Sequence, residues 1–257
     1  MIHPAAVVED GASLGEGVEV GPFAVIEGGA EVGDGCVIAA HAVIRRGVRL
    51  GPGCRIDSFA VIGGDPNHLG FDRSIPSGVE IGAHTVLRES VTVHRSIEAN
   101  GSTRIGEGCF LMAGSHAAHD CSLGGEVVLA NNVLLAGHVS VGARSFLGGG
   151  AAIHQFIRIG EGAMVAGLAR ITKDIAPYLL VGERDEVAGL NLTGLRRRKV
   201  PAEAVRELKA LYQAILRSPG NPVETGSNRE PPVHEEGRRF LEFFIPSKRG
   251  YAKNLVS

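Results

Sequence analysis

The segment SHAAHDC, residues 115–121, places two histidines, an aspartate and a cysteine within seven residues. A histidine next to an aspartate can act as a general base with an orienting carboxylate, because a neutral imidazole accepts protons near pH 7. The same residue types are also zinc ligands. A third interpretation is ordinary packing in a repetitive chain. The three interpretations differ in where each side chain points, so the elements that carry the segment decide between them.

The composition excludes several classes of protein. The chain has 257 residues, of which 44% are hydrophobic, only 5% are aromatic and 37 are glycine, and its net charge is −2. This charge gives no general attraction to nucleic acid. No apolar run reaches the roughly 18–20 residues that cross a bilayer. The first residues lack the basic and apolar regions of a secretory signal. We therefore expect a cytoplasmic protein with reduced cysteines.

Aliphatic residues recur at every sixth position. The pattern runs from Ile2 to Ile62, stops, and returns from Ile81 to Ile171. A period of six fits neither an α-helix nor an isolated strand, but it is typical of a parallel β-helix in which three hexapeptides make one triangular coil of about eighteen residues. The loss of phase predicts an inserted loop at about residues 64–78. One skipped repeat predicts a smaller loop at about residues 95–102.

A second column of small residues lies two positions before each aliphatic residue and should also point into the coil. The four cysteines of the chain fall in this column: Cys36, Cys54, Cys109 and Cys121. We therefore predict that they are buried packing residues and not metal ligands. His116 directly precedes an inward-facing alanine and should point outward. His119 lies two positions beyond that alanine, outward or at a turn.

Residues eighteen apart lie above one another in adjacent coils, with strands about 4.8 Å apart. Asp120 therefore shares a column with His138, and Gly137 lies over His119 without a side chain to fill the space. The corner predicted from this spacing comprises His119, Asp120, Gly137, His138, His154 and Gln155. Three histidines from neighbouring coils or subunits could bind zinc, but the chain lacks the helical HExxH pairing.

The repeat ends at Ile171, and residues 172–257 have a different pattern. Residues 172–200 are expected to form a connector that ends in the basic run 196–199. Segments 201–218 and 234–245 have helical spacing of apolar residues, with a loop at about 218–233 between them. We predict a mainly β protein, with a parallel β-helix over residues 1–171, followed by a connector and a small α-helical C-terminal region that covers the open end of the coil.

Five motifs, in order, resemble one family. They are ESVTVHR (89–95), HAAHDC (116–121), LANNVLLAGHVSVG (129–142), AAIHQFIRIG (151–160) and NLTGLRRR (191–198). With the ending RRFLEFFIPSKRGY they resemble the acyl-carrier-protein–UDP-N-acetylglucosamine O-acyltransferases of lipid A biosynthesis. The resemblance implies a left-handed coil, an exception to the usual crossover rule, and a homotrimer with sites in clefts between parallel prisms. It also implies transfer of a 3-hydroxylated acyl chain from acyl carrier protein to the sugar 3-hydroxyl.

The resemblance also implies roles for individual residues. His119 would be the general base, Asp120 its orienting carboxylate, and Gly137 the oxyanion-hole residue. Substrate contacts are implied at His138, His154, Gln155, Asn191, Arg197 and Arg198, and Gly167 matches the position that sets acyl-chain length. His116 at the cleft and His68 in the inserted loop complete the candidate substrate contacts. No cofactor and no metal are expected. Seven basic residues either meet an acidic carrier protein or form a solvated charged face, and the sequence leaves both open: Arg196, Arg197, Arg198, Lys199, Lys248, Arg249 and Lys253.

Two departures from the family pattern concern the acceptor. The family commonly has Gln-Asp-Leu-Lys in the inserted loop, whereas this chain has Asn67, His68, Leu69 and Gly70. A glutamate common near the last motif is Thr193 here. These changes leave open a different acceptor, such as a 3-amino UDP-sugar acylated on nitrogen. Two further functions stay open on the sequence: a zinc hydratase of the γ-carbonic-anhydrase type and a non-catalytic scaffold.

Overall fold

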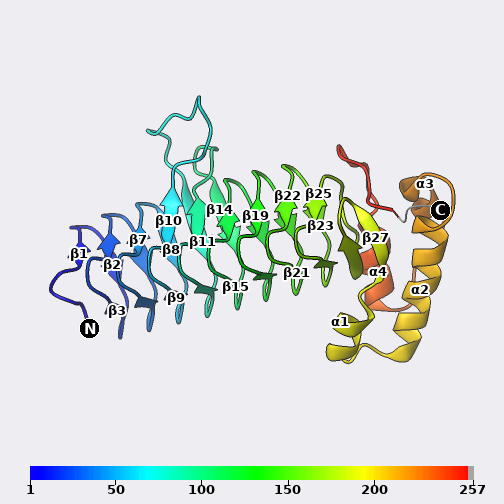
Figure 1. Ribbon diagram of the computed structural model, residues 1–257, viewed down its shortest axis with the longest axis horizontal. Helices are drawn as coiled ribbons and strands as arrows, with labels where there is room; N and C mark the ends of the chain where they lie inside the picture. Colours follow the sequence, from blue (N-terminus) through cyan, green and yellow to red (C-terminus); the bar gives the residue numbers. More distant parts are fainter. Residues whose placement is uncertain (254–257) are drawn as a thin grey trace.

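The structure, a computed structural model, describes residues 1–253. From β1 to β25, short strands follow one another in threes, and each strand pairs in parallel with the third strand before and after it within this range. Over this range, paired residues in adjacent coils are eighteen apart wherever no loop intervenes, as in Val7 with Val25. The chain therefore winds into a prism with three flat sheets, and the coils stack along its long axis (Figure 1).

We name the three sheets after their first strands. The β1 sheet contains β1 (Val7–Val8), β4 (Val25–Ile26), β7 (Val43–Ile44), β10 (Val61–Gly64), β13 (Thr92–His94), β16 (His116–Ala117), β19 (Leu134–Leu135), β22 (Ala152–Ile153) and β25 (Arg170–Ile171). The β2 sheet contains β2 (Ser13–Leu14), β5 (Glu31–Val32), β8 (Val48–Leu50), β11 (Gly78–Ile81), β14 (Ser102–Ile105), β17 (Ser122–Leu123), β20 (Ser140–Val141) and β23 (Arg158–Ile159). The β3 sheet contains β3 (Glu19–Val20), β6 (Val37–Ile38), β9 (Arg55–Ile56), β12 (Val86–Leu87), β15 (Phe110–Leu111), β18 (Val128–Leu129), β21 (Phe146–Leu147), β24 (Met164–Val165), β26 (Leu179–Gly182) and β27 (Glu186–Leu190).

The interior of the prism is filled by the residues of the six-residue period. Ile26, Ile44 and Ile62 from the β1 sheet are fully buried. The small column lies beside them, and all four cysteines in it are at most 1% exposed. Each cysteine thiol lies within 3.2 Å of a backbone carbonyl oxygen one coil away. The cysteine of the SHAAHDC segment is therefore a packing residue, as its spacing predicted.

Two loops interrupt the coils where the phase of the repeat predicted them. The longer one, residues 65–77, connects β10 to β11, and the shorter one, residues 95–101, connects β13 to β14. The longer loop stands out from the prism at the corner between the β1 and β2 sheets (Figure 1). Because of the shorter loop, strands β13 and β16 pair with a register of 24 residues instead of 18, as in Thr92 with His116.

The C-terminal region differs from the predicted connector. Residues 179–190 form the hairpin of β26 and β27, in which β26 extends the β3 sheet in parallel and β27 returns antiparallel. The β-structure thus continues beyond Ile171, where the six-residue period ends. Helix α1 (Leu192–Arg197) follows, and helix α3 (Pro222–Ser227) lies in a segment expected to be a loop.

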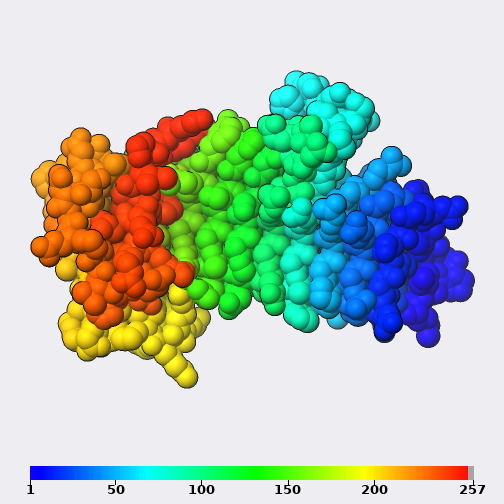
Figure 2. All heavy atoms as spheres, turned by 180° about the vertical axis from the view of Figure 1, so that it is seen from behind, coloured from blue at the N-terminus to red at the C-terminus, as the bar shows by residue number. Residues whose placement is uncertain are grey.

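The two predicted helices are present as α2 (Ala202–Leu216) and α4 (Glu235–Glu242), and they pack against each other. Their apolar faces bury Leu208 and Phe240. Figure 2 shows this region, in yellow to red, closing one end of the prism, with the inserted loop in cyan standing out from the surface. Among residues 1–253, no helix combines the length and the apolar character needed to cross a bilayer.

Candidate active site

The histidine–aspartate pair lies in the turn that joins the β1 and β2 sheets after β16. His119 Nδ1 is 2.8 Å from Asp120 Oδ2. Asp120 adopts a left-handed backbone conformation, with φ of 60°, which aspartate tolerates better than most residues. Its N–H donates to the Oγ1 of the buried Thr103 at 2.8 Å. The turn is therefore fixed, and both side chains project outside the coil.

Hydrogen bonds determine the charge of Asp120 and the tautomer of His119. The Ser96 hydroxyl donates to Asp120 Oδ1, and the Ile97 N–H donates to Oδ2 at 3.3 Å. Burial alone would raise the pKa of Asp120, but the hydrogen bonds from Ser96 and His119 hold that pKa below its usual value. An ionised carboxylate only accepts hydrogen bonds. The hydrogen of a neutral His119 ring therefore lies on Nδ1, and Nε2 carries the free lone pair.

Gly137 lies directly against the His119 ring. A Cβ atom at Gly137 would stand 2.5 Å from His119 Cε1 and 2.6 Å from Nε2, which is too close for any side chain. Only glycine allows the imidazole to approach the backbone here. Among residues 1–253, no acceptor takes the N–H of Gly137. The ring of His119 and an unpaired backbone N–H thus lie side by side.

A column of rings continues above the pair. His138 meets the His119 ring edge-on, with centroids 5.1 Å apart, and its Nε2 is 3.9 Å from Asp120 Oδ2. Phe156, one coil later, stacks on His138 with centroids 4.6 Å apart. His154 and Gln155 lie exposed in the same turn as Phe156. The structure therefore brings together all six residues of the corner predicted from the spacing.

His116 points outward from β16, beside this corner. Its Nδ1 is 2.7 Å from Thr92 Oγ1, and its ring lies edge-on to His94, with centroids 4.6 Å apart. Burial lowers the pKa of His116, and burial together with the rings of His116 and His119 lowers the pKa of His94 to about 4. Both rings are therefore neutral at pH 7. His94 was not among the candidate residues, because the loop insertion hides its place beside His116.

His119, Asp120 and His138 offer three possible metal-ligand atoms within 4.8 Å of one another. Zinc holds nitrogen and oxygen ligands at about 2.0–2.2 Å. Both carboxylate oxygens of Asp120, however, already accept hydrogen bonds, and His119 Nδ1 lies at hydrogen-bond distance from one of them. The arrangement favours a general base over a metal centre.

The remaining candidate residues lie elsewhere on the chain. Asn191 caps helix α1, accepting from the Gly194 N–H at 2.9 Å, and donates to the Gly162 carbonyl at 3.0 Å. Arg198 pairs with Glu161 at 2.5 Å. These residues occupy the corner between the β2 and β3 sheets, not the corner of His119.

Two further candidates lie away from the corner of His119, and a third shares it. Arg197 is exposed on α1, whereas His68 is exposed on the inserted loop, which stands at the same corner as His119. Gly167 lies between β24 and β25, where an added Cβ would be 3.3 Å from the Gly149 carbonyl oxygen. A single copy of the chain therefore holds the predicted base and its neighbours at one corner, with His68 on the loop of that corner, and holds Asn191, Arg197, Arg198 and Gly167 elsewhere.

The coil and its outward His–Asp pair, beside an open backbone donor, define the class of hexapeptide-repeat transferases. Two overlapping segments, residues 11–46 and 29–64, match the family model described as bacterial transferase hexapeptide (six repeats). Residues 174–252 match the model described as UDP N-acetylglucosamine O-acyltransferase, domain 2.

Relatives that cover most of the chain are more specific. An acyl-(acyl-carrier-protein)–UDP-N-acetylglucosamine O-acyltransferase of Alkalilimnicola ehrlichii is 53% identical over 219 residues, which cover 84% of each chain. The solved UDP-N-acetylglucosamine acyltransferase of Campylobacter jejuni is 36% identical, with 99% of this chain and 100% of that chain covered and a TM-score of 0.90. The corresponding structure from Francisella novicida is 30% identical, covers 99% and 94%, and has a TM-score of 0.95. This chain belongs to the family of acyl-carrier-protein–UDP-N-acetylglucosamine O-acyltransferases, and its coil is the left-handed parallel β-helix.

Proposed function

We propose that this chain transfers a 3-hydroxyacyl group from acyl carrier protein to the 3-hydroxyl of UDP-N-acetylglucosamine, the first step of lipid A biosynthesis. Membership of the family supports the reaction. The observation that carries the site assignment is the free Nε2 of His119, which lies against Gly137 beside an open N–H. A base and an oxyanion donor that face the same space are what acyl transfer to a hydroxyl requires.

The reaction needs one base and one oxyanion donor. His119 Nε2 takes the proton of the sugar hydroxyl as its oxygen attacks the thioester carbonyl carbon. The Gly137 N–H stabilises the negative oxygen of the tetrahedral intermediate, an effect worth about 3–4 kcal/mol in comparable sites. The intermediate then collapses, the C–S bond breaks, and the imidazolium returns the proton to the departing thiolate. Asp120 keeps the imidazole in the required tautomer and stabilises its charged form.

The same proposal covers the partners. The thioester is already activated, so no cofactor or metal takes part. His138, His154 and Gln155 border the base and are assigned to the acceptor, and Lys248 reaches the same corner, with Nζ 5.9 Å from the Phe156 ring centroid. Acyl carrier protein is the second partner, met by the basic residues of the C-terminal region. The proposal places the protein in the cytoplasm, as we expected from the sequence.

The outer faces of the prism support a homotrimer. Outward residues of two sheets are largely apolar: Val7, Val25, Val43, Val61 and Leu134 on the β1 sheet, and Val37, Val86, Phe110, Val128, Phe146 and Met164 on the β3 sheet. Outward residues of the third sheet are polar: Ser13, Glu31, Arg49, Glu80, Arg104, Ser122, Ser140 and Arg158 on the β2 sheet. Two apolar faces that share an edge suit a ring in which each copy packs against two others. Such packing would also bring Arg198 of one copy toward His119 of another.

A charge on an apolar face tests the trimer. Phe146 is 36% exposed on the β3 sheet, and we expect Phe146→Asp to convert the trimer into monomers in analytical ultracentrifugation. Ser122→Asp adds the same charge to the polar β2 sheet and serves as the control. A Phe146→Asp protein that stays trimeric, or a wild-type protein that is monomeric at micromolar concentration, would contradict the assembly.

A matrix of donors and acceptors tests the reaction. Carrier proteins that bear acyl chains of several lengths are each combined with UDP-N-acetylglucosamine and with its 3-amino analogue, and the acylated sugar is measured by mass spectrometry. We expect O-acylation by the wild-type protein and loss of most turnover in a folded His119→Ala variant. Transfer only to the amine would show that the acceptor is the 3-amino sugar. The analogue is included because the exposed His68 stands where the family has an aspartate. No transfer with any pair, or activity abolished by a zinc chelator, refutes the proposal.

A further inference from the structure

The small loop at residues 95–101 lies against the carboxylate of Asp120. Ser96 at the start of this loop is fully buried, and its hydroxyl donates to Asp120 Oδ1. The next residue, Ile97, donates its N–H to Oδ2 at 3.3 Å. The carboxylate is thus held by His119 from its own turn and by two donors from a different coil.

The single hydrogen of the Ser96 hydroxyl is directed at Asp120. The Glu98 N–H donates to Ser96 Oγ at 2.9 Å and occupies an acceptor position of the oxygen. The other acceptor within reach of the hydroxyl, the Glu98 carbonyl, is 3.5 Å away, which is long for a hydrogen bond from a hydroxyl. The ionised Asp120 only accepts, so the Ser96 O–H and the carboxylate form a charge-assisted pair.

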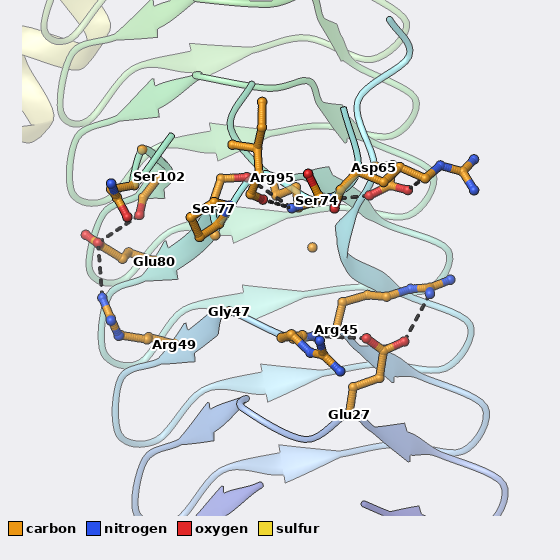
Figure 3. A pocket seen from close by; sticks show the side chains of 18 residues that line it. Glu27, Arg45, Gly47, Arg49, Asp65, Ser74, Ser77, Glu80, Arg95 and Ser102 are labelled. Atoms are coloured by element: carbon orange, nitrogen blue, oxygen red, sulfur yellow. Dashed lines mark hydrogen bonds and ion pairs between the residues drawn. The ribbon is translucent and has the colours of Figure 1, made fainter. Parts of the chain in front are cut away.

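The backbone of Ser96 is also fixed. Its carbonyl oxygen accepts from Ser77 Oγ at 2.7 Å. The preceding residue, Arg95, has a side chain that is only 12% exposed and donates to the carbonyls of Ile75 at 2.7 Å and Arg73 at 2.9 Å and to Asp65 Oδ1 at 2.9 Å. Figure 3 shows Arg95 beside Asp65, Ser74 and Ser77 of the inserted loop. These residues line a cleft of about 660 Å³. The two loops therefore form one anchored unit that ends at Asp120.

We propose that Ser96 is a positioning residue for acyl transfer. Its hydroxyl fixes the Asp120 carboxylate in the orientation that holds the Nδ1–H of His119 and directs Nε2 toward Gly137. The inference rests on the proposed function, because it assigns His119 the part of the base. Ser96 is fully buried, so its effect passes through Asp120.

The competing explanation is that Ser96 only tethers the loop, and a matched variant separates the two. Ser77→Ala removes the hydrogen bond to the Ser96 carbonyl and leaves Asp120 untouched. We expect Ser96→Ala to lower kcat about tenfold to a hundredfold, the range for a lost hydrogen bond to a charged group, with KM for both substrates within about twofold. Ser77→Ala should keep kcat within about threefold of the wild type. Equal losses of kcat in the two variants would show a tether and overturn the proposal.

A double-mutant comparison tests the route through Asp120. In an Asp120→Ala background, Ser96→Ala should change kcat by less than about twofold, because the group on which it acts is gone. The same tenfold or larger loss in both backgrounds would refute positioning through the carboxylate.

A readout that is independent of turnover keeps this inference separate from the proposed function. With 15N-labelled histidine, the nitrogen shifts of His119, assigned with His119→Gln, report which ring nitrogen carries the hydrogen. We expect the Nδ1–H tautomer in the wild type and a mixture in Ser96→Ala, and identical spectra would refute the inference. If the wild type transfers no acyl group, the proposed function fails. The nitrogen shifts would still show whether Ser96 fixes the tautomer of His119.

Discussion

Gly137→Ala is the sharpest test of the site, because the structure predicts a large loss of activity with only a small loss of stability. The new Cβ would lie 2.5–2.6 Å from His119 Cε1 and Nε2, so the ring must move by about 1 Å to reach ordinary contact, and a displacement of this size costs about a hundredfold in rate. The His119 side chain is 17% exposed and can swing toward solvent. The free energy of unfolding should therefore fall by less than the ~1–3 kcal/mol of an overpacked core.

The measurement is kcat for acyl transfer together with the midpoint of thermal unfolding. Alanine keeps the backbone N–H, so a loss of kcat reports the position of the ring and not the loss of the donor. Gly125→Ala is the control, because Gly125 occupies the same place in a turn at a different corner and its added Cβ would be 3.3 Å from the Glu107 carbonyl oxygen. If Gly137→Ala retains kcat within about threefold, or Gly125→Ala loses as much, the reasoning is wrong.

Three further results are expected. Asp120→Asn should lower kcat about a thousandfold or more, because an amide can donate to Nδ1 and move the ring hydrogen to Nε2; unchanged binding of UDP-N-acetylglucosamine by calorimetry serves as the control. Lowering the pH from 7 to 5 should cost about 1–2 kcal/mol of unfolding free energy through the half-buried His94, whose pKa is lowered to about 4. Between about pH 6.5 and 4, this histidine binds a proton in the unfolded chain but not in the folded chain, so the free energy of unfolding falls as the pH falls. In urea titrations, the unfolding free energy of His94→Gln should depend less steeply on pH than that of the wild type, and an equal dependence would contradict this. Arg95→Ala should free residues 65–77 from their anchor, so the amides of this loop should exchange faster in the variant than in the wild type, while the amides of the coils stay unchanged. Equal exchange rates of the loop in the variant and the wild type would contradict this.

The fold was predictable because one repeated constraint sets it. An aliphatic residue every six positions specifies an inward column at each strand, and residues such as Ile26 and Ile44 are buried as that column requires. The hairpin of β26 and β27 was missed because it lies beyond the period and pairs antiparallel at the end of the sheet. Helix α3 was missed because its sequence, PVETGS, is short and rich in turn-forming residues.

The corner of the site was predictable for the same reason. The residues that hold this corner in place from outside the repeat were not. Asp120 and His138 are eighteen residues apart with no loop between them, so their stacking follows from the coil length. Ser96 is 24 residues from Asp120, because the small loop lengthens that coil, and no periodic rule gives the path of a loop. The pairing of Arg198 with Glu161 spans 37 residues and depends on how the C-terminal region docks.

The open N–H of Gly137 follows from the choice of one residue in the coil below it. At the same turn position near the N-terminus, the Gly28 N–H donates to the carboxylate of Glu9 at 3.0 Å, and the next coil repeats this cap. The residue that would cap Gly137, nineteen positions earlier as Glu9 is from Gly28, is Ala118, which has no side-chain oxygen to offer. This edge of the coil therefore contains a position for a negatively charged oxygen at successive levels. At the level where the capping residue is Ala118, the proposed function assigns that position to the substrate oxyanion beside His119.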